Sequence, residues 1–241
     1  MHGVTREGNS QAGKRIPGPT VARLPLYHRA LTVMAQRGIT HVSSSELAVV
    51  VGVNAATLRR DLSRFGTYGT RGTGYEVPYL LACVDGALAL DGDWPVAIVG
   101  IGNLGRALAH SRGFRSGGFR VAALVDVDPA VFGTTLDGIV VEHAERLGEV
   151  CSRERVRIGV ITTPAAASQS VAEQLVAAGV RSILNFAPLV LSLPPGVTVR
   201  QVDLAAELQV LAFYHSRPSG RAAVAASRNG EASNRGVGVS P

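Results

Sequence analysis

The sequence predicts an α/β protein in two parts, a small helix-turn-helix domain followed by a doubly wound sheet of parallel strands. Three observations predict this fold class. Two short helical segments meet at a glycine turn at Gly52, a glycine-rich turn at residues 100–105 stands between a buried strand and a helix, and strand and helix patterns then alternate to residue 186. The chain has 241 residues, 46% of them hydrophobic and 17% charged, which suffices for a buried core in each part.

The first part begins with apolar residues at helical spacing over residues 20–38, with Pro25 near the helix start or separating a first turn. The run of three serines before Glu46 places a serine three residues ahead of a glutamate, which is a capping-box pattern opening a helix over 45–51. Gly52 then permits a left-handed turn, and Asn54 can cap a second helix over 55–65. Two helices joined in this way predict a helix-turn-helix.

Residues 66–75 read GTYGTRGTGY and predict a tight hairpin, or wing, whose tip carries Arg71. An arginine there suits a narrow A·T-rich minor groove, while Arg59, Arg60 and Arg64 on the preceding helix can reach the major groove. Residues 1–80 hold ten basic and four acidic residues, and residues 81–215 hold ten basic and thirteen acidic. The basic first part therefore favours DNA as its partner over a merely solvated basic helix beside a loop.

The second part follows a helix over about residues 79–90, which packs or links. A buried strand at 96–99 leads into Gly100, Gly102 and Gly105 and then a helix, the context that a dinucleotide-binding fingerprint requires. The next strand, 119–125, ends at Asp126, 21 residues after Gly105, where a carboxylate can accept hydrogen bonds from the adenine ribose hydroxyls. No arginine adjoins Asp126 to welcome a 2′-phosphate, so the pattern predicts NAD(H) as the cofactor.

Further alternation predicts strands at 139–141, 158–162 and 182–186, with helices from about 144 and over 166–178. Two short turns close the last strands at their carboxyl ends, where ligands of doubly wound sheets bind, although turns of purely structural value are the alternative. The expected cofactor-binding residues are Gly100, Ile101, Gly102, Asn103, Leu104, Gly105, Asp126, Thr162, Thr163, Pro164, Asn185, Phe186, Ala187 and Pro188.

A catalytic base is not evident. His110, His143 and His215 stand in no recognisable base motif, and Cys151 has no evident activator, so each is expected to be a surface or packing residue. Nucleotide binding without chemistry suggests a sensor rather than an enzyme. Two cysteines are too few for a disulfide framework or a structural zinc site, and no apolar run approaches the ~20 residues of a membrane helix. We expect no metal, no membrane association and a cytoplasmic location.

The chain resembles the Rex family of redox-sensing repressors over about residues 16–216. The resemblance is carried by LRRDLS at 58–63, GTYGTRGTGY at 66–75, GIGNLG at 100–105, ILNFAP at 183–188 and the VDL that opens the last helix. It implies a homodimer that binds inverted-repeat operator DNA as the NAD+ or apo form and is released by NADH. It also implies that the amphipathic C-terminal helix, residues 203–216, is swapped onto the partner subunit.

The resemblance also implies roles for particular residues. Arg29 is expected to pair with Asp203 of the swapped helix as a switch between DNA reading and sensing. Ser111 replaces a tyrosine that many members tie to that switch, and Arg64 replaces a usual tyrosine, which puts the strength of NADH discrimination and the DNA preference in question. The expected DNA-binding residues are Ser44, Arg59, Arg60, Ser63, Arg64, Tyr68, Arg71 and Gly72.

The expected domain limits are 17–78 for the winged helix, 79–202 for the Rossmann-like domain and 203–216 for the swapped helix, with disordered tails at 1–16 and 217–241. The sequence is also compatible with two alternatives. One is an NAD-dependent oxidoreductase with a helical appendage, and the other is a DNA-binding regulator tuned to another nucleotide or to an acyl-CoA.

Overall fold

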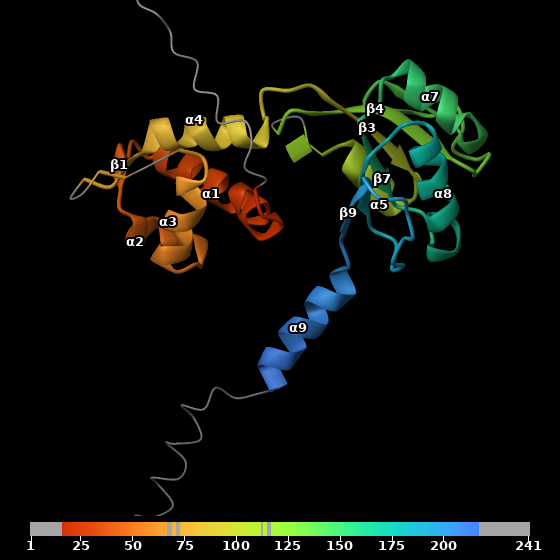
Figure 1. Ribbon diagram of the computed structural model, residues 1–241. Coiled ribbons are helices and arrows are strands. Elements are labelled where there is room, and N and C mark those ends of the chain that lie inside the picture. The colour runs from red at the N-terminus through yellow and green to blue at the C-terminus, as the bar shows by residue number, and fades with distance from the viewer. Residues whose placement is uncertain (1–15, 67–68, 71–72, 112, 115–116, 217–241) are drawn as a thin grey trace, which may run out of the picture. The chain divides into compact units, whose positions relative to one another are not determined.

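A computed structural model describes residues 16–66, 69–70, 73–111, 113–114 and 117–216. The chain divides into two compact units, Met1–Gly92 and Asp93–Pro241 (Figure 1). The sequence placed the end of the first domain at residue 78, whereas the structure places this limit after Gly92. The expected tails span residues 1–16 and 217–241, and of these only residue 16 lies within the described ranges. No helix within the described ranges is long and apolar enough to cross a membrane.

The described residues of the first unit form four helices and a two-stranded antiparallel sheet (Figure 1). Its elements are α1 (Gly18–Gln36), β1 (His41–Val42), α2 (Ser44–Val51), α3 (Ala55–Ser63), β2 (Tyr75–Glu76) and α4 (Val77–Leu88). Helix α4 packs along α1, which is why the helix expected near 79–90 belongs to this unit. Pro25 lies inside α1, about two turns after the helix begins at Gly18, so it does not mark the helix start.

Short-range hydrogen bonds explain where α2 and α3 begin. The Ser43 hydroxyl accepts from the Glu46 amide at 3.1 Å, and the Glu46 carboxylate accepts from the Ser43 amide at 2.8 Å, which confirms the capping box. Gly52 ends α2 in a left-handed conformation (φ 75°), and the Asn54 side chain accepts from the Thr57 amide at 2.7 Å to begin α3. These bonds confirm the helix-turn-helix predicted from the sequence.

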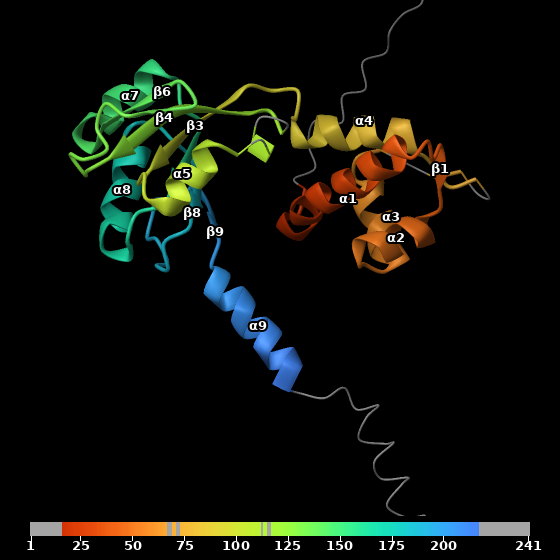
Figure 2. The ribbon, with the colours of Figure 1, turned by 180° about the vertical axis from the view of Figure 1, so that it is seen from behind.

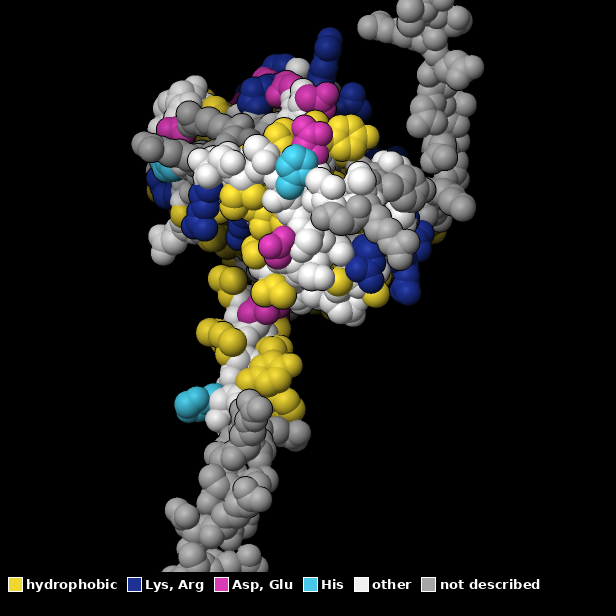
Figure 3. Space-filling model, turned by 90° about the vertical axis from the view of Figure 1, so that its left-hand side faces the viewer, with side chains coloured by type: hydrophobic (Ala, Val, Ile, Leu, Met, Phe, Trp, Pro, Cys, Tyr) yellow, Lys and Arg dark blue, Asp and Glu magenta, His cyan; other side chains and the backbone are white. Residues whose placement is uncertain are grey.

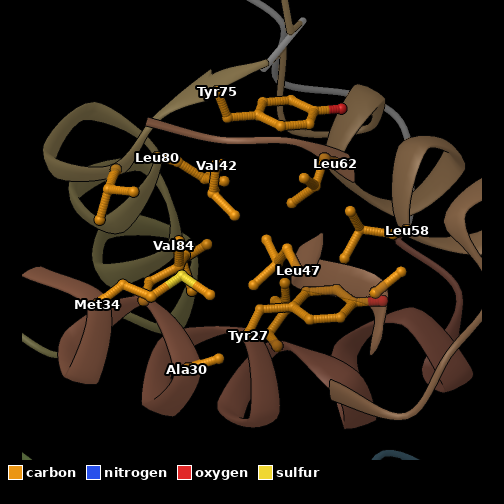
Figure 4. Close-up of a cluster of buried hydrophobic side chains, with 14 residues drawn as sticks. Tyr27, Ala30, Met34, Val42, Leu47, Leu58, Leu62, Tyr75, Leu80 and Val84 are labelled. Atoms are coloured by element: carbon orange, nitrogen blue, oxygen red, sulfur yellow. The ribbon is translucent and has the colours of Figure 1, made fainter. Parts of the chain in front are cut away.

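One hydrophobic core holds this unit together, as Figure 4 shows, and every helix and both strands contribute to it. Tyr27 and Met34 project from α1 toward Leu47 of α2 and Leu58 of α3. Helix α3 buries Leu58 and Leu62 against this core. Arg59 and Arg60, which lie between them in the sequence, therefore face the solvent.

The second unit is built on a seven-stranded sheet with the order β5-β6-β4-β3-β7-β8-β9. All neighbouring pairs are parallel except β5 with β6. Numbered along the chain, the six parallel strands have the order 3-2-1-4-5-6, the arrangement of dinucleotide-binding sheets. The strands are β3 (Trp94–Val99), β4 (Phe119–Asp126), β5 (Thr135–Leu136), β6 (Ile139–His143), β7 (Ile158–Ile161), β8 (Ser182–Asn185) and β9 (Thr198–Gln201).

Helices cover both faces of this sheet (Figures 1 and 2). Alternate residues of β3 enter different cores: Ala97 and Val99 pack with α7 and α8, whereas Val96 and Ile98 pack on the side of α5. The helices between its strands are α5 (Asn103–Ala109), the 3-10 helix η1 (Ala144–Arg146), α7 (Leu147–Arg153) and α8 (Ala165–Ala177). Helix α9 (Leu204–Ser216) follows the last strand, does not cover the sheet and has no buried residue (Figure 1). The doubly wound sheet is thus confirmed. The short strands β5 and β9 were not predicted.

Candidate functional sites

A crevice opens where the connections from β3 and from β7 diverge. The chain leaves β3 toward β4 on one side, and it leaves β7 toward β8 on the other, so the carboxyl ends of these adjacent strands form the point at which doubly wound sheets bind ligands. The cavity there measures about 560 Å³. It is lined by Val99, Gly100, Ile101, Gly102, Asp126, Val127, Asp128, Val131, Ala144, Thr162, Thr163, Pro164, Ala167 and Val171.

The three glycines of the first turn have different physical reasons to be glycine. Gly100 has φ +99°, and a Cβ there would lie 2.9 Å from the Thr162 carbonyl carbon. A Cβ on Gly105 would lie 1.9 Å from the Gly100 oxygen, so α5 can approach β3 only without one. A Cβ on Gly102 would meet no described atom within 4 Å. The protein itself does not require this last glycine, and its bare backbone leaves room for a ligand.

Asp126 joins the end of β4 to the glycine turn. Its carboxylate accepts hydrogen bonds from the amides of Val127 (2.6 Å) and Asp128 (2.9 Å), and also from the Ile101 amide. These bonds hold a half-buried negative charge at the wall of the crevice. A carboxylate at this place can accept the ribose hydroxyls of NAD(H) and repels a 2′-phosphate.

The turn after β7 forms the opposite wall. The Thr162 hydroxyl donates to the Gly100 carbonyl at 2.6 Å and so ties the two turns together. The Thr163 hydroxyl is buried and has no hydrogen-bond partner among the described residues, which leaves a polar group available to a ligand. Bare backbone at Gly102, a fixed carboxylate at Asp126 and this hydroxyl together fit a dinucleotide.

Seven of the fourteen residues expected to bind the cofactor line the crevice: Gly100, Ile101, Gly102, Asp126, Thr162, Thr163 and Pro164. Among the others, Gly105 packs against the Gly100 carbonyl, and the side chain of Asn185 is fully buried and bonded to Leu189 of the following loop and to Gln201 of β9. The remaining five, Asn103, Leu104, Phe186, Ala187 and Pro188, do not line the crevice. The sequence missed its apolar walls, since Val131, Ala167 and Val171 carry no motif.

The helix α3 presents its basic side chains outward. Arg59, Arg60 and Arg64 are exposed, and the Arg59 guanidinium donates to the hydroxyl of Ser44 at the start of α2 at 3.0 Å. Ser63 lies on the same helix, half-buried, with its hydroxyl donating to the Arg60 carbonyl at 2.9 Å. The structure therefore gathers five of the expected DNA-binding residues on α2 and α3.

One residue of α3 points the other way. The Asp61 side chain is 2% exposed and accepts from the hydroxyls of Thr20 (2.9 Å) and Tyr27 (2.7 Å) and from the guanidinium of Arg23 (2.7 and 2.9 Å), all on α1. Burial acts to raise the pKa of Asp61, but these hydrogen bonds outweigh it and the pKa is lowered. Burial, with the bond to Asp61, raises the pKa of Tyr27 to about 12, so its hydroxyl remains a donor. Sequence reasoning missed this cluster, because its members lie about 40 residues apart.

The segment expected to form the wing is described in part. Its base is the antiparallel pair β1–β2, and Thr70 pairs with Gly74 beyond it. Gly74 has φ +81°, and a Cβ there would lie 2.4 Å from the Val42 carbonyl oxygen, so only glycine fits against β1. Tyr68, Arg71 and Gly72 lie outside the described residues.

The two expected switch residues lie in different units. Arg29 is exposed on α1. Asp203 begins α9, where its carboxylate accepts from the amides of Ala205 (2.9 Å) and Ala206 (3.1 Å). Of the two residues that depart from the family pattern, Arg64 is exposed at the end of α3 and Ser111 is half-buried just after α5.

Cys151, His143 and His110, three of the side chains considered above for catalysis, do not line the crevice. Burial raises the pKa of the Cys151 thiol to about 11, which opposes formation of a thiolate. His143 Nδ1 accepts from the Glu145 amide at 3.1 Å, and His110 faces Asp137 at 3.1 Å. Within the described ranges, no group of three or more metal-ligating side chains comes together.

Comparisons with known proteins match both units. Residues 91–189 match the family model "CoA binding domain", and residues 15–63 match "Putative DNA-binding protein N-terminus". The chain is 60% identical over 205 residues to the redox-sensing transcriptional repressor Rex of Streptomyces griseus, covering 85% of this chain and 81% of the relative. It is 46% identical to Rex of Desulfitobacterium hafniense, over 83% of this chain and 95% of the relative.

Solved structures agree with these matches. The crystal structure of RSP in complex with β-NAD+ and operator DNA has a TM-score of 0.80 and 30% identity, covering 91% of this chain and 99% of that chain. The crystal structure of RSP in complex with β-NADH has a TM-score of 0.77 and 31% identity, covering 84% and 95%. A further crystal structure describes RSP as a Rex-family repressor.

Proposed function

The chain belongs to the Rex family of redox-sensing transcriptional repressors, and we propose that it represses transcription when NADH is scarce and leaves its operator when NADH binds. The observation that carries this proposal is the presence in one chain of two separate devices. One is a helix-turn-helix with outward arginines, and the other is a dinucleotide crevice whose Gly102 has no reason within the protein to be glycine.

DNA binding is assigned to α2, α3 and the wing. The exposed arginines of α3 can donate to guanine edges in the major groove or to phosphates, and Ser44 can donate to a phosphate. Arg71 would enter the adjacent minor groove. Solved RSP with operator DNA, similar over 91% of this chain, supports an operator as the partner.

NADH and NAD+ are the ligands that we assign to the crevice. The carboxylate of Asp126 would accept the adenine ribose hydroxyls, and the backbone at Gly102 would lie against the pyrophosphate. The ligand supplies a nicotinamide ring whose redox state is the signal, and the protein need only bind the two states unequally. The fixed carboxylate of Asp126 also favours NAD(H) over an acyl-CoA as the ligand of this crevice.

A homodimer with an exchanged α9 accounts for the apolar surfaces of the second unit. Leu204, Leu208 and Leu211 follow one side of α9, and Val210, Phe213 and Tyr214 follow another, all of them about half exposed or more (Figure 3). A helix that is apolar on several sides is expected to be buried by a partner. The sheet face that carries α5 has its own apolar cavity of about 450 Å³, whose lining includes Phe114, Phe119 and Leu184. A second copy can cover both.

The link between the two devices is proposed to be the pair of Arg29 with Asp203 of the partner subunit's α9. An ion pair that forms in only one conformational state of the dimer would stabilise that state. A ligand that binds this state more tightly than the other then shifts the equilibrium toward it. In a dimer, DNA affinity also depends on the spacing of two recognition helices, one helical turn of DNA or a multiple of it apart. A change in that spacing is enough to release the operator.

A dehydrogenase is the competing function, and the site favours a binding role. Such an enzyme needs an acid or base beside the nicotinamide. Among the described residues, the crevice lining contains no histidine, cysteine or lysine. Of its two carboxylates, Asp126 ends β4 and Asp128 follows it, on the side assigned to the adenine ribose. The curated relatives are named as repressors.

Fluorescence anisotropy of a labelled A·T-rich palindromic duplex tests this proposal. The protein is bound to the duplex at fixed salt and titrated with NADH, then separately with NAD+. We expect NADH to release the duplex and NAD+ to leave it bound. Equal release by both ligands, or release by neither, would contradict redox sensing, and substrate-dependent oxidation of NADH would favour the enzyme.

A further inference from the structure

A buried amide cluster holds the loop that follows β8. The side chain of Asn185 is 0% exposed, and its amide group donates to the carbonyl of Leu189 at 2.9 Å and to the side-chain oxygen of Gln201 at 2.8 Å. Its own oxygen accepts from the Ala187 amide at 3.0 Å. The segment 186–197 joins two parallel strands without a helix. The side-chain amide of Asn185 supplies hydrogen bonds that hold this segment in place.

Gln201 links this loop to the strand that leads into α9. Besides accepting from Asn185, its side-chain amide donates to the Ala187 carbonyl at 2.6 Å. The next residue, Val202, donates its amide to the Asn185 carbonyl at 2.9 Å, and Asp203 then caps α9. Gln201 is thus two residues before the cap and is bonded directly to the loop after β8.

The loop begins beside the crevice. The Phe186 amide donates to the Ile161 carbonyl at 2.9 Å, and the residue after Ile161 is Thr162, which lines the crevice and bonds the glycine turn. If ligand binding displaces the turn after β7, Phe186 is therefore displaced as well. Because Gln201 is bonded to the loop that begins at Phe186, either Gln201 moves with this loop or its hydrogen bonds break.

We propose that Gln201 is a positioning residue that couples the state of the crevice to the direction of α9. This inference rests on the proposed function, since it presumes that NADH binding changes DNA affinity. The two hydrogen bonds of Gln201 make the loop and the start of α9 move as one body. Without these bonds, NADH and operator DNA still bind, but the coupling free energy between their two sites is smaller.

Gln169 provides a matched control. It lies on α8 and holds the same loop from the other end, since its side chain donates to the Ser192 carbonyl at 2.9 Å and accepts from the Ser192 amide at 3.0 Å. Like Gln201, it makes two side-chain hydrogen bonds that hold this loop, one as donor and one as acceptor. Neither bond of Gln169 involves β9 or α9. Loss of loop stability alone would affect both variants alike.

The experiment uses the full chain and three substitutions: Gln201→Met, Gln201→Glu and Gln169→Met. For each protein we would measure the Kd for NADH by fluorescence, and the Kd for an operator duplex with and without saturating NADH. The ratio of the two operator values is the coupling factor. Gln201→Glu keeps the acceptor for Asn185 but loses the donor to Ala187, so it serves if the methionine variant does not fold.

We expect Gln201→Met to lower the coupling factor by about tenfold, through the operator Kd measured with saturating NADH. The Kd for NADH and the operator Kd without NADH should each change by less than about threefold. Gln201→Glu should fall between Gln201→Met and the wild type, and Gln169→Met should keep the wild-type factor. An unchanged factor in both Gln201 variants, or an equal loss in Gln169→Met, would overturn the inference. A wild-type factor near one would overturn the proposed function as well, and the two failures are therefore distinguishable.

Discussion

The carboxylate of Asp61 on α3 and the guanidinium of Arg23 on α1 form a two-bond ion pair, with distances of 2.7 and 2.9 Å. Asp61 stands between Arg60 and Leu62, so the pair fixes the rotation of α3 about its own axis. That rotation decides which side chains face outward, and Arg59, Arg60 and Arg64 do so.

Replacing Asp61 by Asn should therefore impair DNA recognition as well as stability. Removing one partner of a buried pair costs about 3 kcal/mol of unfolding free energy. Loss of folded protein alone would weaken binding to operator and to random DNA equally. We expect the ratio of the two affinities, measured by anisotropy, to fall in the folded fraction. An unchanged ratio would show that the pair only stabilises the unit.

Acid should destabilise the first unit through the same carboxylate. The pKa of Asp61 is lowered in the folded chain, so its contribution to stability is present above the ordinary carboxyl pKa and is lost as the pH falls through the lowered value. The window lies below about pH 4. Hydrogen–deuterium exchange of α1 and α3 should accelerate there in the wild type. The Asp61→Asn variant should lack this part of the acid dependence, and equal acid sensitivity in both would contradict the assignment.

Two glycine substitutions separate ligand binding from folding. Gly102→Ala places a methyl group in the open crevice, so the chain should fold normally and bind NADH about tenfold more weakly, about 1.4 kcal/mol. Gly105→Ala places its methyl group against the Gly100 oxygen, so it should lower thermal stability. Thermal melts with NADH titrations check both. Wild-type affinity in Gly102→Ala would mean that the ligand does not lie against this backbone.

Polar substitutions on α9 should dissociate the proposed homodimer. The double substitution Leu208→Glu and Leu211→Glu places two charges on a side of α9 that we expect to be buried by the partner. Sedimentation should then show a monomer, and operator affinity should fall because two half-sites are no longer bound together. Glu207→Gln, on the same helix, is the control and should remain dimeric. A dimeric double variant would place the interface elsewhere.

The features that the sequence predicted correctly depend on neighbouring residues. The capping box of Ser43 with Glu46 and the Asn54 cap arise from contacts within a few positions, and the strand and helix on either side of the glycine turn arise from a strand-turn-helix pattern. Asp61 looked like one charge on a basic helix, because its partners on α1 are remote in the sequence. Asn185 carried a motif at a ligand-binding edge, yet its side chain points into its own loop toward Gln201, which bore no sequence signal.

The reciprocity of the two binding equilibria gives the most direct test of coupling between the crevice and the operator-binding surface. If NADH weakens operator binding, operator DNA must weaken NADH binding by the same factor. Titrating NADH into the protein with and without saturating operator duplex, at one salt concentration, measures that factor from the other side. We expect the NADH Kd to rise by the factor found in the DNA titration, while the NAD+ Kd is unchanged or lowered. An NADH Kd that is indifferent to the operator would contradict the claim that one chain couples these two sites.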